Sequence, residues 1–134
     1  MQPLRWPLVS AALLAGTAVM AGAFGAHALR AGLSARQMEI WETAAHYQLA
    51  HALALLALSL GMLALPQLAT SALARWSSRL LLAGTVIFSG SLYALVLSGV
   101  TVLGAVTPIG GTLLIAGWLL LALAAAKLDT PLDR

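Results

Sequence analysis

The chain contains no cysteine, and only 8% of its residues are charged. Without cysteine, disulfides, thiolate metal ligands and thiol nucleophiles are excluded, although no compartment is assigned by that absence. Soluble domains carry about 25% charged residues, so this charge content excludes an ordinary soluble fold. Charge is absent altogether from residues 6–29, 43–74 and 80–126. Because a spanning helix requires about 20 apolar residues, each of these stretches is long enough to cross a membrane.

The charge-free stretches predict four transmembrane helices. The first two accommodate one span each, and the third accommodates two spans joined by a tight turn. In lipid every backbone amide must be paired within the protein, and continuous Leu, Ala and Val runs favour helices over a barrel. We therefore expect one transmembrane domain, residues 1–134, with an all-α fold: an integral membrane four-helix bundle. The expected spans lie near residues 7–29, 45–65, 79–102 and 108–127.

Residues 30–44 form the most polar stretch of the chain. Ser34 followed by Gln37 fits a capping box, in which the serine accepts an amide bond and the glutamine reaches back. Met38 and Trp41 then share one stripe, with charged residues on another. This pattern predicts an amphipathic helix near residues 34–45, between the first and second spans and at the outer membrane–water interface, with Trp41 toward the lipid headgroups.

The distribution of basic residues predicts the orientation of the chain. With the amino terminus inside, the outer face holds two basic residues, Arg30 and Arg36. The inner face then holds Arg5, Arg75, Arg79, Lys127 and Arg134. The positive-inside rule therefore favours two cytoplasmic termini. The net charge of +3 reflects this orientation rather than a surface for nucleic acid. The first apolar run is closer to a full span than to a short signal core, so we expect no signal cleavage.

Small residues recur along the first expected span at intervals of three or four. This ridge is suited to close helix packing, which in lipid relies on dispersion and weak polar contacts. Its members are Ala11, Ala15, Ala18, Gly22 and Gly25, and Gly90 is the corresponding packing position in the third span. Before the fourth span, Thr107 is expected to cap and Pro108 to take the first helical position. Gly110 and Gly111 are expected to let another backbone approach.

Polar side chains predict a cluster in the outer half of the bundle. Tyr47, Gln48 and His51 fall in the first turns of the second span. A histidine inside a span is costly to leave unpaired, so His51 should face other helices or water. His27 lies at the outer end of the first span, and Ser91 or Tyr93 of the third span should lie opposite. The expected cluster therefore contains His27, Tyr47, Gln48, His51, Ser91 and Tyr93.

Four separated segments resemble one family in order and spacing: GAFGAHAL, TAAHYQLAHALALL, FSGSLYAL and TPIGGTLLIAGW. They resemble the YgdD-like small membrane proteins, the family called domain of unknown function 423, which includes eukaryotic transmembrane protein 256. The resemblance covers nearly the whole chain. It implies a small multi-pass protein of the bacterial inner membrane, and it brings no reaction, substrate or cofactor. The positions characteristic of the family are Gly22, Gly25, His27, Tyr47, Gln48, His51, Gly90, Ser91, Tyr93, Pro108, Gly110 and Gly111.

Three functions remain open from the residues alone. The first is an interaction or assembly protein that packs with itself or with another membrane protein. The second is a proton or small-molecule transporter using His27 and His51, although the spans hold no acidic residue. The third is haem or metal binding by His27 and His51, for which two histidines are weak support.

Other classes of function are not expected. The chain shows no Ser-His-Asp set, phosphate-binding loop or paired catalytic carboxylates, so we do not expect an enzyme. No cofactor, metal site or nucleic-acid surface is predicted. The expected surroundings are the lipid bilayer and a second copy or another membrane protein.

Overall fold

The computed structural model describes residues 5–128, and every regular element in this range is a helix. The elements are α1 (Arg5–Phe24), the π-helix η2 (Gly25–Leu29), α2 (Ala35–Ala64), α3 (Pro66–Thr70), α4 (Ala72–Ser98), the 3₁₀ helix η3 (Thr101–Ala105) and α5 (Thr107–Ala125). Four helical segments in this part of the chain are long and apolar enough to cross a membrane: Arg5–Leu29, Ala35–Ala64, Ala72–Ser98 and Thr101–Ala125. The predicted all-α fold with four spanning helices is confirmed.

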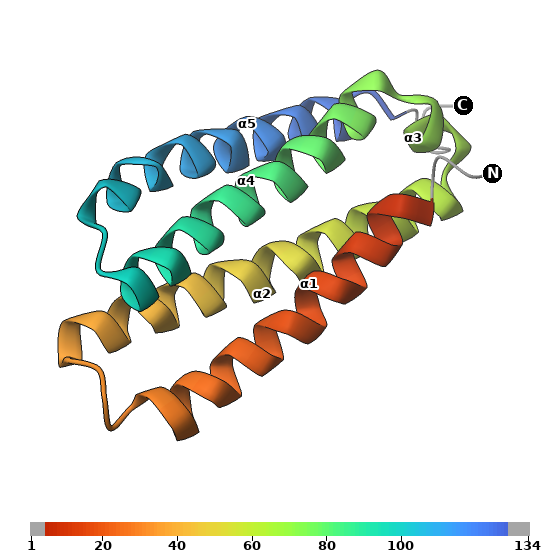
Figure 1. Ribbon diagram of the computed structural model, residues 1–134. Helices are drawn as coiled ribbons and strands as arrows, with labels where there is room; N and C mark the ends of the chain where they lie inside the picture. The colour runs from red at the N-terminus through yellow and green to blue at the C-terminus, as the bar shows by residue number, and fades with distance from the viewer. Residues whose placement is uncertain (1–4, 129–134) are drawn as a thin grey trace.

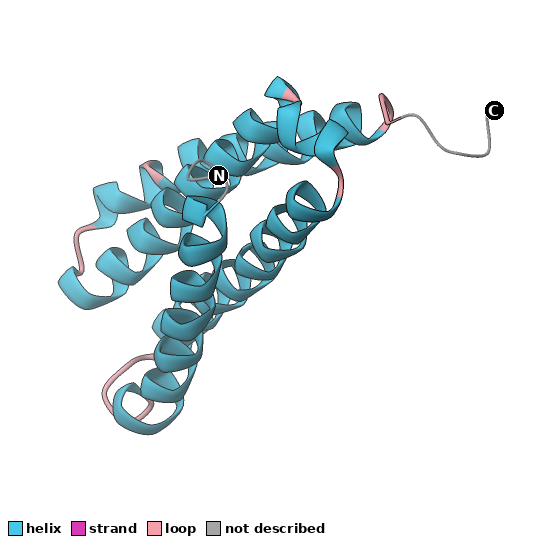
Figure 2. Ribbon diagram, turned by 90° about the vertical axis from the view of Figure 1, so that its right-hand side faces the viewer, coloured by secondary structure: helices cyan, strands magenta, loops and turns pink. Residues whose placement is uncertain are grey.

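The four long helices lie side by side in the order α1, α2, α4, α5 (Figure 1). Each packs mainly on its neighbour in this series, and α4 with α5 forms the most extensive pair. Short connections join the helices at both ends (Figure 2). Helix α1 begins, and helix α5 ends, at the same end of the bundle, next to α3 (Figure 1). The chain therefore crosses the bundle four times and returns to the end from which it started.

Helices α4 and α5 pack through glycines that bring backbone against backbone. A Cβ atom added at Gly84 would lie 2.9 Å from the backbone nitrogen of Leu114. A Cβ added at Gly110 would collide with the backbone nitrogen of Phe88, and Gly111 faces the Phe88 ring. The Ser77 hydroxyl of α4 also donates to the backbone oxygen of Gly117 on α5. Backbone contact of this kind is the usual way for membrane helices to gain packing energy.

The small-residue ridge of α1 is only partly used for packing within the chain. Ala11, Ala18 and Gly25 are buried, while Ala15 is half-buried and Gly22 is exposed. These three buried positions are seven residues apart, so one narrow seam of α1 faces the bundle. Within the described chain Gly22 packs against no neighbouring helix, because a Cβ there would meet no heavy atom within 4 Å.

The predicted packing role of Gly90 is also wrong within this chain. A Cβ added at Gly90 would meet no heavy atom within 4 Å, and the residue is exposed on α4. Because α5 packs on the Gly84 face of α4 and α2 on another, no helix of the described chain covers Gly90. The exposed glycine is left at the surface that lipid or a partner would contact.

Both helix starts that the sequence marked are present, but their caps differ. Ser34 forms the complete capping box with Gln37 at the start of α2. The amphipathic segment continues from there into the second span without a break. Thr107 does not cap α5, contrary to expectation, since it is already the first helical residue and the cap position is Val106. Its hydroxyl instead lies 2.7 Å from that of Ser91, and Pro108 occupies the first turn.

The substitution Gly110→Ala should destabilise the bundle. The added methyl collides with backbone atoms of α4, and overpacking of this kind costs about 1–3 kcal/mol. We expect a lower midpoint of thermal unfolding in detergent. Gly16→Ala is the matched control, because that position has open space and gains helix propensity. Equal midpoints for the two variants would contradict the backbone contact.

Candidate functional site

One buried amide joins three helices at the centre of the polar cluster. The Gln48 side chain of α2 is 6% exposed. Its Nε2 donates to the backbone oxygen of Leu14 at 2.9 Å and to the Thr17 hydroxyl at 2.7 Å, both on α1. Its Oε1 accepts from the Tyr93 hydroxyl of α4 at 2.8 Å. Gln48 thus uses both N–H groups and one oxygen to hold α1 and α4 against α2.

Trp41 fills the space between α1 and α2 one layer farther out. Its Nε1 donates to the backbone oxygen of Ala21 at 2.8 Å, and its ring lies 4.6 Å from that of Tyr93. The prediction that Trp41 points toward the lipid headgroups is wrong, since it is 5% exposed. Gly25 is the cause: a Cβ there would lie 2.6 Å from the indole, so only glycine admits the ring. The indole then gains a buried hydrogen bond and two aromatic neighbours.

Two buried serines add further bonds between helices. The Ser89 hydroxyl of α4 donates to the backbone oxygen of Ala44 on α2, and Ser77 donates to that of Gly117 on α5, each at 2.8 Å. Among the described residues, no buried side-chain nitrogen or oxygen lacks a hydrogen-bond partner. A fully satisfied buried network makes a fold rigid and specific. These polar groups therefore serve the structure of the bundle.

A second polar group lies on another face of α2, toward α4 and α5. The Tyr47 ring stacks 4.4 Å from Phe88 and 5.8 Å from His51, measured between centroids. His51 Nδ1 lies 2.8 Å from the Tyr47 backbone oxygen, and the Trp118 indole N–H donates to His51 Nε2 at 3.2 Å. A carbonyl only accepts and an indole only donates. His51 therefore fits as the neutral tautomer with its proton on Nδ1.

The two ring nitrogens of His51 meet the Tyr47 backbone oxygen and the Trp118 indole, so the side chain faces another helix, α5. Ser91 and Tyr93 bond to other groups. The Trp118 side chain finds a partner for its N–H in His51 and is 46% exposed.

The structure separates the six residues of the predicted cluster. Gln48 joins Tyr93, Tyr47 joins His51, and Ser91 joins Thr107. His27 is exposed in η2 and has no hydrogen bond or ring contact to any described residue. Consecutive helical residues point about 100° apart, so Tyr47 and Gln48 face different neighbours.

The geometry gives no support to joint ligation by His27 and His51. Both nitrogens of His51 are engaged, and His27 does not meet it. Within residues 5–128, no group of three His, Cys, Asp or Glu side chains is placed to hold a metal ion.

The sequence interpretation missed the role of Thr17 as a partner of Gln48. A signal was present, because Thr17 is the single polar residue between Ser10 and His27. A lone hydroxyl in the middle of a span can bond its own helix, and Thr17 does so through the backbone oxygen of Leu13. The Thr17 hydroxyl oxygen also accepts from Gln48 Nε2.

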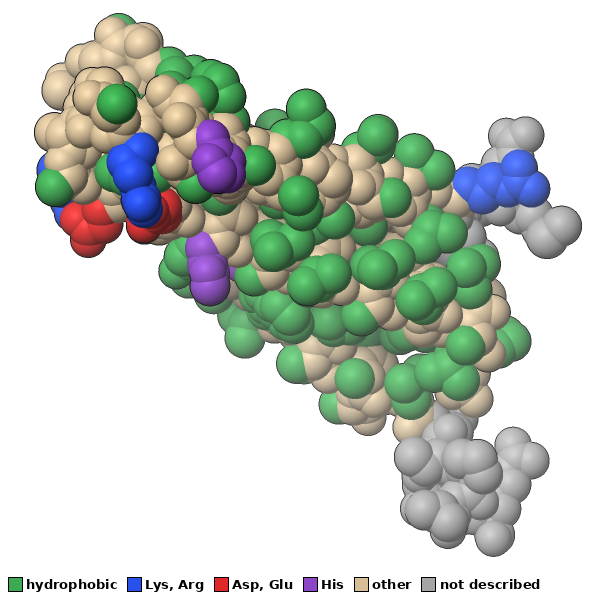
Figure 3. All heavy atoms as spheres, turned by 90° about the horizontal axis from the view of Figure 1, so that it is seen from below, with side chains coloured by type: hydrophobic (Ala, Val, Ile, Leu, Met, Phe, Trp, Pro, Cys, Tyr) green, Lys and Arg blue, Asp and Glu red, His purple; other side chains and the backbone are tan. Residues whose placement is uncertain are grey.

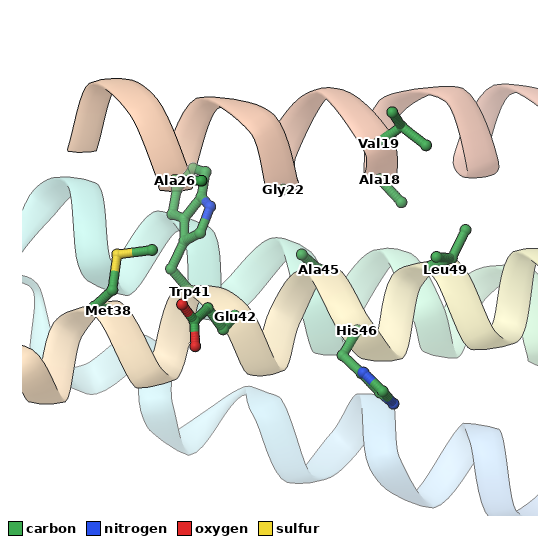
Figure 4. Close-up of a pocket in the computed structure, with 10 residues that line it drawn as sticks. All are labelled: Ala18, Val19, Gly22, Ala26, Met38, Trp41, Glu42, Ala45, His46 and Leu49. Atoms are coloured by element: carbon green, nitrogen blue, oxygen red, sulfur yellow. The ribbon is translucent and has the colours of Figure 1, made fainter. Parts of the chain in front are cut away.

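Two open grooves lie on either side of α1. The α1–α2 groove, with a volume of about 320 Å³, is drawn in Figure 4 and is lined by Ala18, Val19, Gly22, Ala26, Met38, Trp41, Glu42, Ala45, His46 and Leu49. The α1–α4 groove has a volume of about 290 Å³ and is lined by Leu14, Thr17, Ala21, Gln48, Thr85, Val86, Ser89, Gly90 and Tyr93.

Charged side chains gather at the ends of the molecule, with a hydrophobic surface between them (Figure 3). The two glutamates, Glu39 and Glu42, lie near the start of α2, and Glu39 forms an ion pair of 2.8 Å with Arg36. A membrane would therefore cover the middle of the bundle and leave the start of α2 at the membrane–water interface.

The chain matches the model of a protein family described as "Protein of unknown function (DUF423)" over residues 21–111. A "UPF0382 membrane protein" of Staphylococcus epidermidis strain ATCC 12228 is 48% identical over 96 residues, which cover 72% of this chain and 75% of that protein. The "UPF0382 inner membrane protein YgdD" of Escherichia coli K12 is 44% identical over 94 residues, covering 70% of this chain and 69% of the relative. No solved structure matches the chain.

Removal of the Gln48 amide should loosen α1. The average interhelical hydrogen bond in a membrane protein contributes about 0.6 kcal/mol, so Gln48→Leu, which removes three bonds, should cost about 2 kcal/mol of unfolding free energy. A double-mutant cycle of Gln48→Leu with Tyr93→Phe should give a coupling near 0.6 kcal/mol. Tyr47→Phe is the control, because the Tyr47 hydroxyl has no hydrogen bond in the described chain and should be additive. If the effects of Gln48→Leu and Tyr93→Phe were additive as well, the hydrogen bond between Gln48 and Tyr93 would be refuted.

Proposed function

The chain belongs to the DUF423 family of membrane proteins, and we propose that it is an assembly protein that receives a transmembrane helix of a partner. Its buried polar groups are used internally, which supports a structural role for them rather than a catalytic one. What the molecule offers to other proteins is its lipid-facing surface, where α1 has a groove on each side. The partner that we propose is a second copy of the chain.

The observation that carries this proposal is Gly90 in the α1–α4 groove. A glycine inside a helix costs about 1 kcal/mol relative to alanine. At Gly84 and Gly110 close contact with another helix offsets that cost, but Gly90 has nothing within 4 Å. Small residues on a membrane helix let a second helix approach its backbone. Ala21 on the opposite wall is small as well, so the groove suits a transmembrane helix.

Gly90→Leu should weaken self-association. The leucine occupies the space where the partner helix would pack, and we expect at least about a tenfold loss of affinity, or about 1.4 kcal/mol. The measurement is energy transfer between donor-labelled and acceptor-labelled chains in proteoliposomes, over a range of protein-to-lipid ratios. Gly16→Leu, which also adds a leucine to an open position but outside both grooves, should associate like the wild type. A strictly monomeric wild type, or equal effects of both variants, would overturn the proposal.

We also propose an inner-membrane location with both termini in the cytoplasm. The Escherichia coli relative is named an inner membrane protein, and Arg5, Arg75 and Arg79 belong to the end where α1 starts. Arg75 donates to the backbone oxygen of Thr70 at 2.6 Å, and Arg79 lies 4.9 Å from the Trp76 ring centroid. Tryptophan is enriched at both membrane interfaces, whereas an excess of arginine and lysine is typical of the cytoplasmic one. Arg134, also assigned to this face, lies outside the described residues.

Reporter fusions in Escherichia coli should verify the orientation. The positive-inside rule predicts that green fluorescent protein fused after Arg134 is fluorescent and that alkaline phosphatase at the same point is inactive. A phosphatase inserted after Gly32, in the connection between η2 and α2, should be active. The reverse pattern would place the termini outside.

A further inference from the structure

The α1–α2 groove exists because Trp41 holds two helices apart whose facing residues are small. The indole lies against Gly25 and bonds to Ala21, so it fixes the separation of α1 and α2 at that level. One turn deeper, Gly22 faces the groove with no heavy atom within 4 Å of its would-be Cβ. Figure 4 shows Gly22 and Ala18 across from Ala45, with Trp41 between the helices at one end. The gap beyond the indole therefore stays open.

The dimensions of the groove suit an extended hydrocarbon chain. Its lining on α2 extends from Met38 to Leu49, about 16 Å at a rise of about 1.5 Å per residue. The middle of the groove is lined by the small residues Ala18, Gly22 and Ala45, and a Cβ added at Gly22 would meet no heavy atom within 4 Å. An acyl chain that lies parallel to the two helices therefore has room between them.

The groove changes from polar to apolar along its length. Glu42 and Trp41 lie at the end nearest the start of α2, and Val19 and Leu49 lie at the other end (Figure 4). The first turns of α2 carry the charges that mark the membrane–water interface. The groove therefore starts at the headgroup level and leads into the hydrocarbon, as a lipid does. The imidazole of His46 points away from α1 (Figure 4).

The charge at the interfacial end selects the headgroup. Glu42 is exposed and forms no ion pair within the described residues, while the neighbouring Glu39 is paired with Arg36. An unpaired carboxylate at a membrane surface favours a cation and disfavours an anionic lipid. A carboxylate at the interfacial end matches the ammonium group of a zwitterionic headgroup.

We propose that the α1–α2 groove is a specific site for a phospholipid with an ammonium headgroup, such as phosphatidylethanolamine. One acyl chain lies along Gly22 and Ala45, and the ammonium group lies at Glu42. The lipid comes from the leaflet that contains the connection between η2 and α2. The site is separate from the α1–α4 groove and does not depend on the assembly role.

Native mass spectrometry tests this site with protein from vesicles of phosphatidylethanolamine and phosphatidylglycerol in equal amounts. We expect the wild type to retain one phosphatidylethanolamine per chain. Gly22→Leu, and Ala45→Leu on the opposite wall, should lower that retention at least about fivefold, or about 1 kcal/mol, because their side chains occupy the groove. Gly16→Leu and Gly90→Leu should retain the lipid, since neither residue lines this groove. Glu42→Gln should abolish the preference over phosphatidylglycerol.

Three outcomes would overturn the proposal. The first is equal lipid retention by the wild type and by both groove-filling variants, each with a wild-type helical circular dichroism spectrum. The second is a wild type that retains both lipids equally. The third is loss of self-association, rather than of lipid, in Gly22→Leu, which would make this groove a protein interface. Because Gly90→Leu reports on self-association alone, failure of the lipid site is distinguishable from failure of the assembly role.

Discussion

The position of α1 depends on the hydrogen bonds that Gln48 donates to it. Among apolar helices in lipid there is no hydrophobic drive for association, so packing and polar contacts must hold each helix in place. α1 packs mainly on α2 and buries only a narrow seam. The Gln48 amide bonds to it twice, and the Trp41 indole bonds once. At about 0.6 kcal/mol for each bond, these three contribute about 2 kcal/mol. The Tyr93 hydroxyl fixes the opposite side of the amide and so orients both donors.

The two halves of the bundle are held together by different means, and this difference explains where the grooves lie. α4 and α5 meet through Gly84, Gly110 and Gly117, at which a side chain would collide with the facing helix. That contact is backbone on backbone and leaves little room. α1 and α2 meet through the Trp41 indole, which is held by Gly25 and keeps the remaining small residues from closing the gap. The α4–α5 contact therefore leaves little room, whereas the side of the bundle with α1 presents the two grooves.

The architecture was predictable because a charge in hydrocarbon is costly, so the uncharged stretches mark the spans. Local pairs were also predictable: Ser34 with Gln37, and Tyr47 with His51, are set by helical spacing alone. The rotation of each helix about its axis was not, because almost every face is apolar and no face is marked as buried. Tryptophan is typical of the membrane–water interface, and Trp41 turns inward only because Gly25, on another helix, leaves space for its ring. The depth of His27 in the membrane suggested that it joins the cluster, but depth does not determine the direction in which a side chain points.

The two grooves share α1 as a common wall, and this has a thermodynamic consequence. Ala18 and Gly22 line one groove, while Leu14 and Ala21 line the other. An occupant of one groove would affect the other only by moving α1, and any such effect would be reciprocal. The hydrogen bonds from Gln48 and Trp41, about 2 kcal/mol together, oppose that movement. The polar network that positions α1 therefore keeps the two grooves separate.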